Sequence, residues 1–201
     1  MESRSGRRPG TPQTREAILD AAMRAFAEDG YAGTTIRGVA RVAGVDPALV
    51  MHFFGSKDGL FEAAIRAGEI PLGLLVEAFE GDPDGLGERL VGRYVSLWED
   101  PVHGPRLRAV MSAAASSPAA AAMLKEFVTQ KVLLPMTRRL GVERADTRGI
   151  LAGAQLIGVA FARYVLEIEP LAKLGRDELV RCVAPAIQRY LTGDLPLDGG
   201  I

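Results

Sequence analysis

The chain has 201 residues, of which 48% are apolar and 24% charged, and this composition excludes a disordered or low-complexity chain. A single cysteine excludes a disulfide framework and a zinc site built on several thiolates. The net charge of −1 gives no sign of a nucleic-acid partner. Through Lys57, however, 8 basic residues stand against 6 acidic ones, so the N-terminal part is mildly basic although the average is not.

The first expected elements are a flexible basic arm over residues 1–11 and a helix. The arm has no long apolar run, so no secretory signal is expected and the protein is expected to be cytoplasmic. In the helix, Ile18, Ala22 and Phe26 recur every four residues and form one apolar stripe. The helical period on its N-terminal side predicts that Gly30 caps this helix rather than opening a strand hairpin.

The next stretch, TTIRGVARVAGVDPALVMHFFGSK, predicts two short helices around a tight turn. Thr34 or Thr35 can N-cap the first helix, and Gly44 supplies a turn residue for which a positive φ costs little. Asp46 can N-cap the second helix. Two helices joined in this way form a helix-turn-helix, which lays its second helix in the major groove of DNA.

This segment, together with the helix before it, resembles the DNA-binding domain of TetR-family (tetracycline-repressor-type) transcriptional regulators. The resemblance covers the first third of the chain. It rests on Ala22, Phe26, Gly30, Tyr31, Thr34, Thr35, Val39, Ala40, Ala43, Gly44, Val45, Phe54, Ser56, Lys57 and Leu60. It implies an all-α fold of about nine helices, with a three-helix DNA-binding domain followed by a helical domain for ligand binding and dimerisation.

The resemblance also assigns roles to matching positions. The start of the first motif helix would face phosphates or a groove edge, residues 46–53 would form the recognition helix, and Lys57 would attract a phosphate at the start of the next helix. The candidate DNA-binding residues are therefore Thr34, Thr35, Arg37, Asp46, Pro47, Ala48, Leu49, Met51, His52, Phe53 and Lys57.

The recognition helix departs from the family pattern. Met51 stands where the family usually has a tyrosine that reaches a phosphate, and Phe53 stands where histidine is usual. The positions 47–49 are also apolar, and apolar side chains can contact a thymine methyl but not the hydrogen-bonding edges of purines. Direct readout is therefore expected to depend on Arg37, His52 and the arm.

The arm carries Arg4, Arg7 and Arg8 against a single acidic residue. Basic arms of this kind can enter a minor groove beside a helix-turn-helix. The alternative is a disordered tail that aids solubility.

The rest of the chain also has helical periodicity, and no strand pattern competes with it. The segment 150–166 is apolar nearly all round, and the final stripe over residues 179–191 contains Pro185. A helix that is apolar on every side must be covered on every side, either by a partner subunit or as the central helix of a monomeric bundle. The candidate dimer-interface residues are Ala154, Gly158, Val183 and Ile187.

Aromatic and methionine side chains are spread over the middle and late helices, where their default role is core packing. The family resemblance implies that these helices also enclose an apolar effector pocket. The candidate pocket residues are Trp98, Met111, Phe127 and Phe161. No catalytic constellation, metal-ligand cluster or cofactor motif is present in the sequence, so neither an enzyme nor a cofactor is expected.

The expected organisation is an arm (1–11), a DNA-binding domain (12–72), an effector and dimerisation domain (73–195) and a tail (196–201). The expected function is a homodimeric repressor that a small apolar or amphipathic effector releases from a palindromic operator. An activator or an effector-independent regulator of the same fold is the main alternative. A helical small-molecule-binding or enzymatic bundle without a DNA function is a further one.

Overall fold

The computed structural model describes residues 11–67, 71 and 73–196, and every regular element among them is helical. Arg4, Arg7, Arg8 and residues 197–201 lie outside this range. The long helical runs match the number expected: α1 (Thr11–Glu28), α3 (Ile36–Ala43), α4 (Pro47–Phe54), α5 (Lys57–Ala67), α7 (Leu86–Glu99), α8 (His103–Ser116), α9 (Pro118–Glu126) continuing into α10 (Leu134–Thr137), α11 (Ala145–Ala160) and α12 (Arg176–Thr192). Single turns form α2 (Gly30–Gly33) and α6 (Gly73–Val76). The all-α prediction is confirmed.

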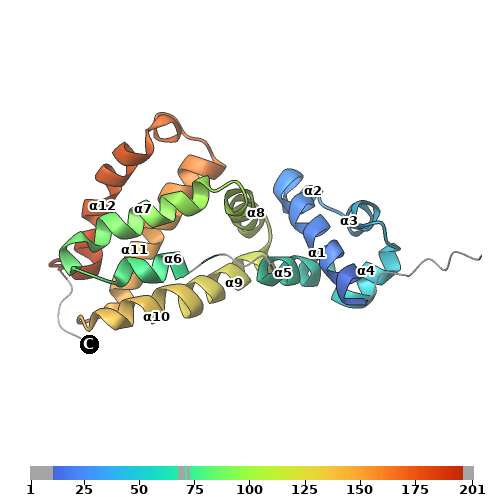
Figure 1. Ribbon diagram of the computed structural model, residues 1–201, viewed down its shortest axis with the longest axis horizontal. Coiled ribbons are helices and arrows are strands. Elements are labelled where there is room, and N and C mark those ends of the chain that lie inside the picture. Colours follow the sequence, from blue (N-terminus) through green and yellow to red (C-terminus); the bar gives the residue numbers. More distant parts are fainter. Residues whose placement is uncertain (1–10, 68–70, 72, 197–201) are drawn as a thin grey trace, which may run out of the picture.

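The N-terminal part, α1 to α5, is built on the inward face of α1 (Figure 1). Ile18, Ala22 and Phe26 of the predicted stripe are fully buried. Phe26 meets Phe61 of α5 edge to face with 4.8 Å between ring centroids, and it stacks on Tyr31 of α2 at 5.8 Å. This aromatic cluster joins α1, α2 and α5 into one support for the α3–α4 pair.

The C-terminal part packs α7 closely against α12. Gly87 permits the approach, because a Cβ there would lie 2.5 Å from the Ala184 carbonyl oxygen and 2.8 Å from Gln188. The Gly87 N–H donates to Gln188 Oε1 at 2.7 Å, so the contact is hydrogen-bonded as well as close. The stripe predicted near the C-terminus lies in this core: Leu179, Val183, Ile187 and Leu191.

The helix that begins as α9 runs without a break through a π-helical segment, Phe127–Leu133, into α10. Pro135 explains the widened turns. Proline has no N–H to donate and its ring crowds the carbonyl four residues earlier, so the usual helical bond to Lys131 cannot form. The effect of the proline therefore appears as π-helical turns just before it.

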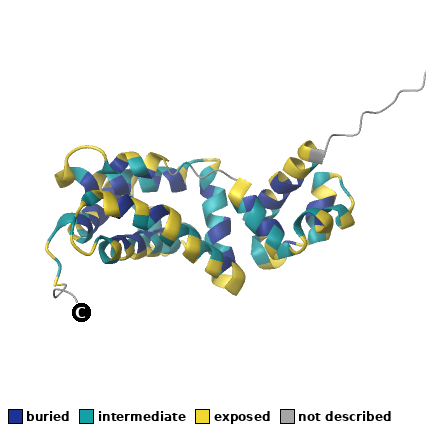
Figure 2. Ribbon diagram, turned by 90° about the horizontal axis from the view of Figure 1, so that it is seen from below, coloured by how far each residue is buried: buried dark blue, intermediate teal, exposed yellow. Residues whose placement is uncertain are grey.

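The two parts meet at α8, which contacts α1 and α2 on one side and α7 on the other (Figure 1). Ala109 and Ala113 of α8 belong to the buried cluster of α1–α5, because small side chains let the helices approach closely. In both parts the buried residues lie on the inward sides of the helices (Figure 2). Within the described residues, no helix is both long enough and apolar enough to cross a bilayer.

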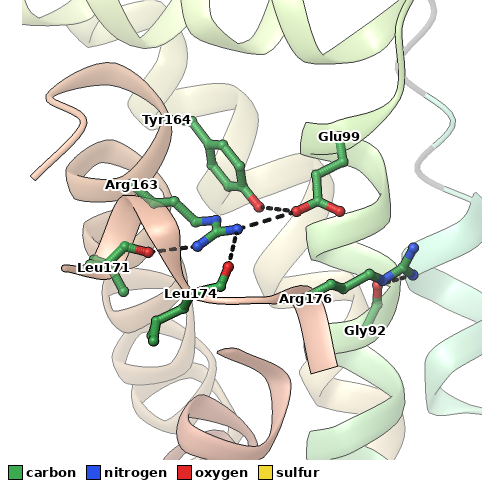
Figure 3. A network of polar contacts seen from close by, with 7 residues as sticks. All are labelled: Gly92, Glu99, Arg163, Tyr164, Leu171, Leu174 and Arg176. Atoms are coloured by element: carbon green, nitrogen blue, oxygen red, sulfur yellow. Dashed lines mark hydrogen bonds and ion pairs between the residues drawn. The ribbon is translucent and has the colours of Figure 1, made fainter. Parts of the chain in front are cut away.

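A buried arginine ties the end of α7 to the segment that follows α11. Arg163, only 8% exposed, donates from Nη1 to the Leu171 carbonyl at 2.6 Å and from Nη2 to the Leu174 carbonyl at 2.8 Å (Figure 3). Glu99 lies 3.5 Å from the same Nη2 and supplies the opposite charge. It also accepts a hydrogen bond from the Tyr164 hydroxyl at 3.2 Å. The network fixes the loop after α11 against α7.

Candidate functional site

The helix-turn-helix has the caps and the turn that its sequence predicts. Thr35 N-caps α3, its Oγ1 accepting from the Gly38 N–H at 3.0 Å. Gly44 ends the helix in the left-handed region, at φ 69°. Asp46 then N-caps α4, its Oδ1 accepting from the Ala48 N–H at 2.7 Å. The hydrogen-bonding needs of both helix starts and of the turn are therefore met by residues within this segment.

The two sides of α4 differ sharply. Val50 is fully buried against α1–α5, whereas Ala48, Met51 and His52 are exposed, Met51 to 44%. The three exposed residues are spaced i, i+3 and i+4, so they share one face of the helix. This face is the candidate DNA-reading surface.

Several residues predicted to contact DNA are instead buried or make contacts within the protein. Thr34 is 2% exposed and its hydroxyl donates to the Gly30 carbonyl at 2.8 Å, so its predicted role at a phosphate is corrected to a structural one. Phe53 is half-buried and packs on the core of α1–α5. Pro47 and Leu49 are also half-buried. The Asp46 carboxylate serves as the cap of α4.

Lys57 lies at the start of α5, as predicted, but its ammonium already makes two contacts within the protein. Nζ donates to the Ala32 carbonyl at 3.4 Å and lies 4.5 Å from the centre of the Tyr31 ring. Desolvation lowers its pKa. The Tyr31 hydroxyl in turn donates to Asp58, so the lysine belongs to a small polar cluster beside the α2 turn. An ammonium has three donors, which leaves capacity for a phosphate.

Two exposed basic residues in or near the helix-turn-helix are absent from the predicted set. Arg41 lies in the last turn of α3, next to the predicted Arg37, which is exposed as well. Arg15 of α1 lies 5.4 Å from the centre of the Phe54 ring at the end of α4. Arg41 could have been found from the helical pattern, because it falls opposite the buried Val39–Ala40 side. Arg15 could not, because its proximity to α4 is a tertiary contact.

A cavity of about 1200 Å³ lies between α7, α8, the α9–α10 helix and α11. Most of its described lining is aliphatic or aromatic, and its wall includes the π-helical segment before Pro135. Trp98, Met111 and Phe127, all predicted for an effector pocket, line it. Phe161, predicted with them, is outside the lining, which corrects that assignment.

A minority of the cavity lining is polar or charged: Arg66, Tyr94, His103, Glu126, Lys131 and Thr137. Burial raises the pKa of the Tyr94 hydroxyl, which therefore stays neutral. Trp98 Nε1 is buried without a hydrogen-bond partner among the described residues. At the edge, His103 Nδ1 lies 2.8 Å from Asp100 Oδ1, and backbone N–H groups of His103 and Val102 lower the pKa of that carboxyl. A ligand here would meet mainly apolar walls, with neutral polar groups and the charged residues Arg66, Glu126 and Lys131 among them.

The predicted dimer residues divide into two groups. Ala154 and Gly158 of α11 are exposed one turn apart, and Ile150, one turn earlier, is 42% exposed. Val183 is 8% exposed and Ile187 fully buried in the core of their own chain, so these two assignments are corrected. The outward side of α12 instead carries Arg181, Cys182, Pro185 and Arg189.

Family models match both parts of the chain. The model described as "Tetracyclin repressor-like, C-terminal domain" matches residues 84–191, more than half of the chain. The model described as "Bacterial regulatory proteins, tetR family" matches residues 18–64, which include α3 and α4.

Individual proteins agree with these models. The HTH-type transcriptional regulator BetI of Burkholderia mallei is 27% identical over 199 aligned residues, which cover 86% of this chain and 95% of BetI. The solved multidrug binding protein EbrR, complexed with imidazole, is 23% identical, covers 100% of both chains with a TM-score of 0.69, and shows a likeness in fold. A solved TetR-family regulator from Streptomyces coelicolor is 36% identical over 94% of this chain and 99% of its own, with a TM-score of 0.61. The chain therefore belongs to the TetR family of DNA-binding transcriptional regulators, which act as regulators and not as enzymes.

Proposed function

We propose that this protein is a homodimeric transcriptional repressor that leaves a palindromic operator when an apolar or amphipathic effector enters its cavity. The observation that carries the proposal is the presence, in one chain, of an outward-facing recognition helix and a cavity of about 1200 Å³, joined through α8. Residues 12–72 would bind one operator half-site, and residues 73–195 would bind the effector and the second subunit. The protein would act in the cytoplasm.

DNA binding is tested first with duplexes selected by the purified protein from random sequences. We expect a palindrome whose half-sites are one helical turn or a multiple apart, because a two-fold dimer presents two copies of α4. Replacing Arg41 by alanine should weaken binding to selected and random duplexes alike and lower the salt dependence, as loss of a phosphate contact does. Equal affinity for selected and random duplexes at moderate salt would refute the proposal.

We assign dimerisation to the exposed stripe of α11 and the outward side of α12, two helices that pack against each other. Gly158 has open space where a Cβ would stand, so a change there leaves the fold of its own chain intact. We expect Ala154→Glu to give a monomer in analytical ultracentrifugation and to reduce operator affinity at least tenfold, because a buried unpaired charge opposes association. Asp194→Ala, on an exposed residue beyond α12, is the control. A dimeric Ala154→Glu variant would contradict this assignment.

Effector binding has a built-in reporter, because Trp98 is the single tryptophan of the chain and lines the cavity. Apolar and amphipathic compounds that shift Trp98 emission should release operator DNA at the same concentrations, by favouring a conformation that no longer fits both half-sites. Val128→Phe fills space at the cavity wall and should abolish both effects. Thr129→Phe, half-buried at the next position but outside the lining, should keep them.

An activator of the same fold is separated from a repressor by a reporter gene placed behind the selected operator. A repressor lowers expression and the effector restores it. Expression that rises on addition of the protein would support the activator reading.

A further inference from the structure

The outward face of α4 has few groups that could form hydrogen bonds with the major groove of DNA. Of its three exposed side chains, Ala48 ends in a methyl group, Met51 in a thioether, and His52 alone carries a strong donor or acceptor. Val50, fully buried on the opposite side, fixes this orientation of the helix. Two of the three exposed side chains of α4 are therefore apolar, and the longer of these two belongs to Met51.

Two of the charged groups near this face, on Asp46 and Lys57, already have contacts within the protein. The Asp46 carboxylate accepts the Ala48 N–H at 2.7 Å, and a carboxylate is repelled by phosphates. The Lys57 ammonium points to the Ala32 carbonyl and the Tyr31 ring. α4 itself contains neither arginine nor lysine, so the bidentate contact to guanine O6 and N7 is not available to it.

In the major groove, the thymine 5-methyl group is the apolar feature that distinguishes one base pair from the others. We infer that α4 selects its operator through thymine methyl groups, which pack against the Ala48 methyl and the Met51 side chain, while His52 bonds to a neighbouring base edge. The inference rests on the proposed function, because it requires α4 to enter the major groove. The half-site is then a duplex with thymines opposite these two side chains.

The test replaces each thymine of a selected half-site by deoxyuridine, one at a time, which removes one methyl group and keeps base pairing. We expect about a fourfold loss of affinity at the thymine that faces Met51, equivalent to about 0.8 kcal/mol for one buried carbon group. In the Met51→Ala variant the same uridine should cost less than twofold. Val42→Ala is the matched control, because Val42 is an exposed apolar residue, 59% exposed, on α3 instead of α4; it should keep the full uridine penalty.

A second variant changes the base preference at this position, so that the test does not rest only on the loss of side-chain packing in Met51→Ala. Met51→Gln has a similar length and an amide that can pair with adenine N6 and N7, so selection by this variant should move the preference at that position from thymine to adenine. Indifference to uridine at every half-site position, or an equal uridine penalty in wild type and Met51→Ala, would overturn the inference. Failure to select any duplex over random DNA would instead refute the proposed function, so the two failures are distinguishable.

Discussion

At the scale of single residues, the helix-turn-helix depends on side chains that never need to touch DNA. Asp46 is such a residue, because its carboxylate satisfies an N–H at the start of α4. We expect Asp46→Ala to lower the free energy of unfolding by about 1 kcal/mol, the usual cost of losing an N-cap. Urea denaturation should show a lower midpoint with an unchanged slope. Asp46→Asn keeps the cap and should unfold like the wild type. An equal loss of stability in Asp46→Ala and Asp46→Asn would mean that the charge of Asp46, and not its cap, is responsible.

Tyr164 provides a residue-level prediction for alkaline pH. Burial raises its pKa to about 12, so the folded protein holds this proton above the range in which an unfolded tyrosine loses it. The unfolded state then binds fewer protons, and stability falls as pH rises from about 10 to 12. Thermal unfolding across this range should show a shallower decline for Tyr164→Phe than for wild type. Parallel curves for the two proteins would contradict the shift.

At the scale of elements, the close contact between α7 and α12 depends on one of the two glycines of α7. A Cβ at Gly87 would collide with Ala184 and Gln188, whereas a Cβ at Gly92 would meet nothing within 4 Å. We expect Gly87→Ala to destabilise the protein by about 1–3 kcal/mol through overpacking. Gly92→Ala should stabilise it by about 0.5–1 kcal/mol, because alanine favours the helix. We expect the melting temperature to fall in Gly87→Ala and to rise in Gly92→Ala. If it fell in both variants, the loss in Gly87→Ala could not be assigned to the close approach of α12.

At the scale of the whole molecule, Arg163 connects α7, the end of α11 and the loop before α12 (Figure 3). Arg163→Met should cost about 3 kcal/mol, because it leaves two carbonyls and a partly buried carboxylate without their partner. The matched control is Arg138→Met, whose ion pair with Asp146 at 2.9 Å is exposed. That variant should leave the melting temperature almost unchanged, since exposed pairs add little. Similar losses in the two variants would count against a special role for the buried network.

The sequence by itself determined the all-α class, the helix-turn-helix and its caps, because these depend on the spacing of residues only a few positions apart. Thr35, Gly44 and Asp46 act on their own turn, and their roles follow from local hydrogen bonding and backbone geometry. Periodicity also identified the buried stripe of α12, since a helix repeats its inward face every three or four residues.

Only the tertiary structure decided which side chains are free to act. The hydroxyl of Thr34 suits a phosphate contact and the apolar side chain of Ile187 suits a subunit interface, yet packing within the chain buries both. Phe161 lies outside the cavity that Trp98 and Phe127 line, although all three are aromatic residues in neighbouring helices. The physical reason is that burial depends on contacts between residues far apart in the chain, which local spacing does not encode. Likewise, the burial of Val50 in the core decides that Ala48, Met51 and His52 form the exposed face of α4.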